Sequence, residues 1–239
     1  ELESYRQPYI GKEKNTQNYA EKVYRTYTCS FSTNKDSLTM WNYYATSGSG
    51  VNLIFDFAWN LFEGSDISEV NNSSHLENDI TICRGLVLYQ RMDKQKCIKA
   101  LLDNLYEVYL QEDTIEKCQS HIQWAFKEAI NNMRCFFKND SFSCENEYRV
   151  ILKIPEELLL EETTGQDGIL KKGQFKRGNI LIPYVDYKFK RDSLKEITLN
   201  PYVKEKESVF ELGIRELLWQ NKIHNVQIYR SAIPMRKYF

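Results

Sequence analysis

The hydrophobic pattern of this chain changes its period twice, and this change limits the folds open to it. Before residue 93 the apolar residues gather in short segments rich in β-branched and aromatic side chains, such as VYRTYTCSFS (23–32) and GVNLIFDF (50–57). Such segments are typical of strands. From 93 to 138 apolar residues recur at helical spacing, and strand-like segments return from 144 onward. The sequence therefore predicts an α+β fold with mostly antiparallel sheets.

The stretch of helical period predicts a helical hairpin inserted between strands. Apolar residues line one face from 98 to 109 and form a second run from 122 to 133, with a break at 112–114. A chain of 239 residues is close to the upper size of one hydrophobic core. We therefore expect residues 1–239 to form a single domain with the helical insertion at about 93–140.

Two further helices are predicted outside the hairpin. In DSLTMWNYYA (36–45) we expect Asp36 to cap the first turn and Leu38, Trp41 and Ala45 to face the core. In VKEKESVFELGIRELLWQN (203–221) the residues expected to face inward are Val209, Leu212, Leu217 and Leu218.

Five more segments are predicted as strands and two as loops. The strands are ICRGLVLYQ (82–90), CENEYRVILKI (144–154), ILIPYVDYKF (180–189), LKEITL (194–199) and NVQIYR (225–230). The loops are a polar tract at 63–79 and a segment rich in Gly and Lys at 163–179.

Charge and cysteine content limit the partners and the compartment. The net charge is −1, from 32 Lys and Arg against 33 Asp and Glu, so the overall field does not draw the protein to nucleic acid or to an anionic membrane. No window approaches the roughly 20 apolar residues of a membrane span. The six cysteines contain no C-x-x-C pair, and no secretory signal precedes them, so we expect reduced thiols in the cytoplasm. The three histidines share no close spacing with a cysteine pair, so no metal site is expected.

Four short segments stand out from this background. They are CSFS (29–32) with the following D-x-x-x-MW-x-x-YA, ENEYR (145–149), RGNILIPY (177–184) and SAIPMR (231–236). Their order and residues resemble those of a bacterial domain-of-unknown-function family, whose members carry CFS, MW-x-x-YA, E-x-EYR, IPY and S-x-IP-x-R motifs. Members of that family usually begin with a further Tyr-rich strand and helix. The resemblance therefore implies that a native N-terminal tract is missing here.

The ENEYR segment is the strongest candidate for chemistry. On a strand, Glu145, Glu147 and Arg149 project to one face, while Asn146 and Tyr148 face the other way. A face of this kind either forms ion pairs with neighbouring strands or presents paired carboxylates. In the second case one carboxylate stabilises an oxocarbenium ion while the other orients a nucleophile.

The pair Ser30 and Ser32, followed later by Glu145 and Glu147, is similar to the S-x-S and E-x-E motifs of ADP-ribosyltransferases. These enzymes bind NAD in a cleft between two small sheets. The resemblance implies that the serines support the wall around the nicotinamide ribose and that Glu147 contacts a ribose hydroxyl. It also implies an NAD-dependent ADP-ribosyltransferase or NAD glycohydrolase, acting as a bacterial toxin or anti-phage effector.

Other residues are candidates for binding. Trp41 and Tyr44 lie on one predicted helix, where they either pack in the core or stack on a base. Arg236 either locks the last strand or contacts an anion. The cluster of Lys171, Lys172, Lys176 and Arg177 around Phe175 is either a solvated loop or a contact for a nucleic acid or protein target.

Two alternatives to the transferase stay open. One is a non-catalytic module that binds a nucleotide or a protein. The other is a metal-dependent nuclease, in which Glu145, Glu147 and Asp56 would hold hard cations.

Overall fold

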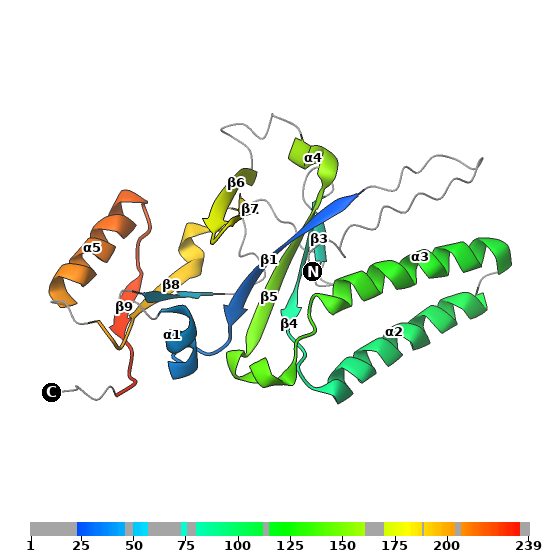
Figure 1. Cartoon of the computed structure of the whole chain (residues 1–239), viewed down its shortest axis with the longest axis horizontal. Coiled ribbons are helices and arrows are strands. Elements are labelled where there is room, and N and C mark those ends of the chain that lie inside the picture. The colour runs from blue at the N-terminus through cyan, green and yellow to red at the C-terminus, as the bar shows by residue number, and fades with distance from the viewer. Residues whose placement is uncertain are drawn as a thin grey trace.

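The computed structural model describes residues 23–45, 50–56, 73–75, 80–111, 115–160, 170–187, 189–203 and 207–234. Within these residues the strands form three sheets, with the orders β1-β5-β4-β3, β2-β8-β9 and β6-β7 (Figure 1). All neighbouring strands are antiparallel except β8 and β9, which run parallel. The predicted α+β fold with mostly antiparallel sheets is confirmed.

The elements follow the predicted order along the chain with three exceptions: strands form at Ser73–His75 and Leu170–Arg177, where loops were predicted, and the helix Glu156–Leu160 was not predicted. The strands are β1 (Tyr24–Ser32), β2 (Val51–Phe55), β3 (Ser73–His75), β4 (Thr81–Leu86), β5 (Glu147–Pro155), β6 (Leu170–Arg177), β7 (Ile180–Tyr187), β8 (Leu194–Leu199) and β9 (Gln227–Arg230). The helices are α1 (Leu38–Tyr44), α2 (Arg91–Gln111), α3 (Ile115–Arg134), α4 (Glu156–Leu160) and α5 (Glu207–Gln220), with 3₁₀ turns η3 (Asp140–Glu145) and η4 (Arg191–Ser193). None of the described helices is both long and apolar enough to cross a membrane.

Strand β5 is the most deeply buried element of the largest sheet. It pairs with β1 along its whole length and with β4 on its other edge. Val150 and Ile154 are fully buried and belong to a core cluster with Ile80, Ile82 and Leu152, whereas Ile151 is buried on the opposite face. Both faces of the strand are therefore covered after its first residues, and Lys153 is its one buried charged residue in this stretch.

Aromatic rings join the largest sheet to the three-stranded sheet. Phe55 of β2 and Phe189 pack against the core clusters of both sheets. Their ring centroids lie 5.0 Å apart, and the Phe55 ring lies 6.1 Å from that of Phe31 on β1 in an edge-to-face arrangement. This row of rings fixes the end of β1 against β2.

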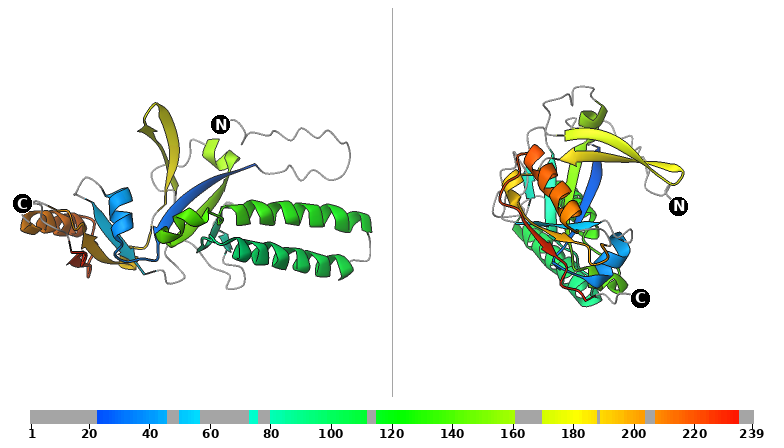
Figure 2. Two further views of the ribbon diagram at one scale, coloured as in Figure 1. Left: turned by 60° about the horizontal axis from the view of Figure 1, so that its bottom comes forward. Right: turned by 90° about the vertical axis from the view of Figure 1, so that its left-hand side faces the viewer.

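The predicted helical hairpin is confirmed. Helices α2 and α3 run side by side and extend away from the sheets (Figures 1 and 2). They end and begin on either side of residues 112–114, where the sequence pattern breaks; those three residues lie outside the described ones. Lys153 of β5 forms an ion pair with Glu128 of α3, which ties the hairpin to the centre of the sheet.

The predicted cap of α1 is wrong. The helix begins after Ser37, whose side chain makes no capping hydrogen bond, and Asp36 lies one residue too early. The Asp36 carboxylate instead accepts hydrogen bonds from the Trp41 indole and from Ser231. These partners occupy the carboxylate in place of the backbone amides of the first turn.

The prediction for the inward face of α5 is wrong for three of four residues. Val209, Leu212 and Leu217 are 63%, 56% and 60% exposed. The residues that pack against the β8 cluster are Phe210, Ile214 and Leu218, which follow one another at intervals of four. This helix carries apolar residues on more than one side, so periodicity alone did not identify the buried side.

The segment KKGQFKRGN is also not the predicted loop, because it forms β6 and the turn of a hairpin. Arg177 pairs with Ile180, so only Gly178 and Asn179 connect the strands. Gly178 has φ of 60°, a value that tight hairpin turns require and that glycine adopts without strain.

Two adjacent leucines of α5 provide a test of this packing. We expect Leu218→Ala to lower the free energy of unfolding by about 1–3 kcal/mol, because it removes apolar contacts with the β8 cluster. Leu217→Ala changes the same residue type on the exposed side and should cost under about 0.5 kcal/mol. Urea denaturation of both variants measures the difference, and equal effects would contradict the observed orientation of α5.

Candidate functional site

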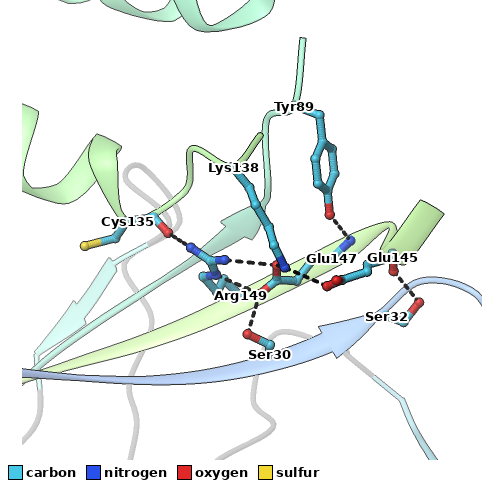
Figure 3. A network of polar contacts seen from close by, with 8 residues as sticks. All are labelled: Ser30, Ser32, Tyr89, Cys135, Lys138, Glu145, Glu147 and Arg149. Carbon is cyan, nitrogen blue, oxygen red and sulfur yellow. Dashed lines mark hydrogen bonds and ion pairs between the residues drawn. The ribbon is translucent and has the colours of Figure 1, made fainter. Parts of the chain in front are cut away.

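The pairing of β1 with β5 brings the serine and glutamate motifs together. Ser30 lies opposite Arg149, and Ser32 lies opposite Glu147. Side chains of directly opposed residues in antiparallel strands point to the same face. All four side chains therefore project from one face of the sheet, as Figure 3 shows.

Glu145 does not lie on the strand, which corrects the predicted alternation at this residue. It ends the 3₁₀ turn η3, and Asn146 then adopts a left-handed conformation with φ of 42°. Strand β5 begins only at Glu147, so the alternation holds for Glu147 and Arg149. The chain nevertheless turns so that Glu145 reaches the same cluster from the side.

The Glu147 carboxylate is 3% exposed and has three partners. Arg149 binds it through both oxygens, with Nε 2.7 Å from Oε1 and Nη2 3.0 Å from Oε2. The Lys138 ammonium lies 3.1 Å from Oε2, and the Ser30 hydroxyl donates a hydrogen bond to Oε1. A buried carboxylate is stable only when it is compensated in this way.

The surrounding residues complete the network. Lys138 Nζ also lies 2.6 Å from Glu145 Oε2, so that one ammonium serves both acids. The Ser32 hydroxyl donates to the Glu145 carbonyl at 2.7 Å, and the Tyr89 hydroxyl accepts from the Glu147 amide at 3.0 Å. Lys138 and Tyr89 were not identified from the sequence, since neither belongs to a motif and their proximity depends on the fold.

These partners change the titration of the site. Burial alone would raise the pKa of Glu147, but hydrogen bonds from Arg149, Ser30 and Lys138 lower it to about 2. Burial alone would lower the pKa of Lys138, whereas its hydrogen bonds to Glu145 and Glu147 raise it overall. Glu147 is therefore an anion at neutral pH and a very weak base.

A pocket of about 630 Å³ lies beside this cluster, between the end of β1, α1 and β2. Its polar wall comes from residues 30–35, and Phe31, Phe55 and Tyr148 are among its apolar residues. Trp41 lines it from a buried position, whereas Tyr44 is 68% exposed. Among the described residues that line it are both predicted serines but neither predicted glutamate.

Asp36 connects the pocket helix to the C-terminal segment. Its carboxylate accepts hydrogen bonds from Trp41 Nε1 at 2.7 Å, Ser231 Oγ at 2.9 Å and the Ala232 amide at 2.8 Å. The predicted motif at 36–45 thus binds directly to Ser231 and Ala232, the first two residues of the motif at 231–236. Arg236 itself lies outside the described residues.

The described residues contain no group of three or more His, Cys, Asp or Glu side chains arranged to hold a metal ion. Cys29, Cys83, Cys97, Cys135 and Cys144 are free thiols.

Part of this site lies in a segment that matches a family model. Residues 40–150 match the model of the family described as Protein of unknown function (DUF2971). The predicted resemblance to a domain-of-unknown-function family is thereby confirmed. The DUF2971 match contains Trp41, Lys138, Glu145 and Glu147, whereas Ser30 lies before it. Neither the curated proteins nor the solved structures gave a match.

The buried charge of Glu147 predicts how stability depends on pH. Because the folded pKa lies below the unfolded value of 4.5, the carboxylate stabilises the fold above about pH 5 and loses this effect as pH falls toward 2. We expect Glu147→Gln to lower the free energy of unfolding at pH 7 by about 1–3 kcal/mol. The difference from wild type should shrink between pH 5 and pH 3.

Urea denaturation at pH 7, 5 and 3 measures this effect. Glu107→Gln on α2 is the control, because Glu107 is exposed and its replacement should have little effect at any pH. A Glu147→Gln difference that stays constant from pH 7 to pH 3 would contradict the assigned ion pairs.

Proposed function

We propose that this protein binds a nucleotide in the pocket between β1, α1 and β2, with NAD as the first candidate. The observation that carries the proposal is the position of Ser30, which is one of the residues lining the pocket and whose hydroxyl donates a hydrogen bond to the buried Glu147 carboxylate. A hydroxyl has one proton and two lone pairs. Ser30 therefore offers the ligand acceptor sites, which suit the ribose hydroxyls and the carboxamide of NAD.

The remaining walls of the pocket support the same ligand class. Its volume of about 630 Å³ lies within the usual range for small-molecule sites, about 300–1,000 Å³. The Tyr44 ring is exposed at the pocket and can stack on a base, while buried Trp41 and Phe55 supply apolar surface. The pocket is lined by β1 and β2, which belong to different sheets, and this position supports the comparison with ADP-ribosyltransferases.

ADP-ribosyl transfer or NAD hydrolysis is the second candidate function. The Ser30–Glu147 hydrogen bond favours it, since it joins the S-x-S and E-x-E motifs at the edge of the pocket. In this function Glu147 would stabilise the ribosyl cation, and Glu145, Arg149 and Lys138 would hold it in place. Both oxygens of Glu147 already have partners, so a direct role requires one of them to be exchanged for the ligand.

We also propose a cellular location, a biological role and a class of partners. The free thiols support a cytoplasmic location. The resemblance to a bacterial family supports a role as a toxin or anti-phage effector. The cationic segment from Lys171 to Arg177 supports contact with a nucleic acid or protein target. A metal-dependent nuclease gains no support from Glu145 and Glu147, because these carboxylates already form ion pairs with Lys138 and Arg149.

Titration with NAD tests the binding proposal. We expect NAD to bind the wild-type chain and Tyr44→Ala to weaken binding by about 5- to 100-fold, the loss that removal of one stacking ring produces. Tyr106→Ala is the matched control, because Tyr106 is 61% exposed on α2 and lies outside the pocket. Isothermal calorimetry measures both. Failure of NAD, ATP and ADP-ribose alike to bind the wild-type protein would overturn the proposal.

Release of nicotinamide tests the second candidate. If the protein is a transferase or hydrolase, wild type should release nicotinamide from NAD and Glu147→Gln should lower the rate by at least about 100-fold. The assay is read by chromatography of the reaction mixture without added metal. Binding of NAD without any release would leave the protein as a binding module and contradict the enzymatic role.

A further inference from the structure

The β6–β7 hairpin carries an exposed surface that the pocket does not use. Figure 2 shows the hairpin standing out from the other sheets. Residues 170–187 contain four cationic side chains, at Lys171, Lys172, Lys176 and Arg177, and one acid, at Asp186. The whole chain has a net charge of −1, so positive charge is concentrated here.

The register separates the two faces of this hairpin. One face of β6 carries Lys171, Gly173, Phe175 and Arg177, and the other face carries Lys172, Gln174 and Lys176. Each of these residues pairs with a residue of β7 on the same face. Val185 packs against the β5 core cluster, so the face that contains Val185 and its partner Lys172 is directed toward the core near the base of the hairpin. The face with Phe175 is therefore directed outward.

Two aromatic rings lie together on this outward face. Phe175 is 47% exposed and Tyr184 is 36% exposed, and their ring centroids are 6.1 Å apart. Tyr184 lies across Gly173, where an added Cβ would come within 2.3 Å of the ring. Glycine thus leaves room for the tyrosine ring to lie over the strand. Lys171 and Arg177 flank the rings along β6.

We propose that this outward face binds single-stranded nucleic acid. Proteins that bind single strands combine aromatic rings, on which bases stack, with cations that contact the phosphates. Phe175 and Tyr184 supply the rings, and Lys171 and Arg177 supply cations on either side. On this face Lys171 and Arg177 outnumber the acid Asp186, which lies opposite Lys171, and a phosphate backbone is complementary to the remaining positive charge. The proposal does not depend on the nucleotide pocket.

Fluorescence anisotropy with labelled (dT)₁₂ and a duplex of equal length tests this proposal on the full chain. We expect the single strand to bind more tightly, and we expect log K against log salt to have a slope of about −1.4, since the face offers two cations and each neutralised phosphate contributes about −0.7. Phe175→Ala and Tyr184→Ala should each weaken binding by about tenfold or more with the slope retained. Lys171→Ala combined with Arg177→Ala should make the slope shallower by about 1.4.

Matched control variants show whether a loss of binding is specific to the outward face of the hairpin. Trp219→Ala removes a 75% exposed aromatic ring on α5, and Lys99→Ala removes an exposed cation on α2; neither should change binding. Tyr44→Ala should leave oligonucleotide binding intact, so failure of the pocket and failure of this surface can be distinguished. Equal binding of duplex and single strand, equal losses in Phe175→Ala and Trp219→Ala, or no binding at 20 mM salt would each overturn the proposal.

Discussion

The compensation of one buried carboxylate organises the region around the pocket. Glu147 starts the central strand β5 at 3% exposure, where an unpaired anion would be strongly destabilising. Arg149 comes from the same strand, Ser30 from the neighbouring strand and Lys138 from the segment after α3. The network therefore ties three parts of the chain to one point. The end of β1, which forms the polar wall of the pocket, is held there as a consequence.

A second carboxylate holds the opposite side of the pocket. Asp36 fixes the indole of Trp41 and, through Ser231 and Ala232, joins α1 to the segment after β9. Phe31 and Phe55 close the space between the two sheets with apolar contacts. Residues of the motifs at 29–32, 36–45 and 145–149 line this pocket, and Ser231 is joined to it through Asp36. Asp36 and Glu147 bind groups of the protein itself, so these two motif residues help to hold the fold together.

The sequence predicted the fold better than it predicted the site. The strand segments, the helical hairpin and the common face of Glu147 and Arg149 follow from local periodicity, and they are present in the structure. Glu145 departs from its predicted face because Asn146 is left-handed, a choice that strand periodicity does not encode. Tyr89 lies far from the ENEYR motif in sequence, and Lys138 lies in a different segment. Only the packing of α3 and β4 against β5 brings them near the motif. The exposed leucines of α5 were also mispredicted, because the sequence does not show which side of a helix packs against another element.

If Ser30 binds the ligand, Glu147 serves the pocket by positioning Ser30. A double-mutant cycle of Ser30→Ala and Glu147→Gln, with NAD affinity measured by calorimetry, tests this most directly. If Glu147 acts through Ser30, its replacement will weaken binding in the wild-type background and have little effect once Ser30 is alanine. Additive losses in the double variant would show that the carboxylate meets the ligand itself and would contradict the account.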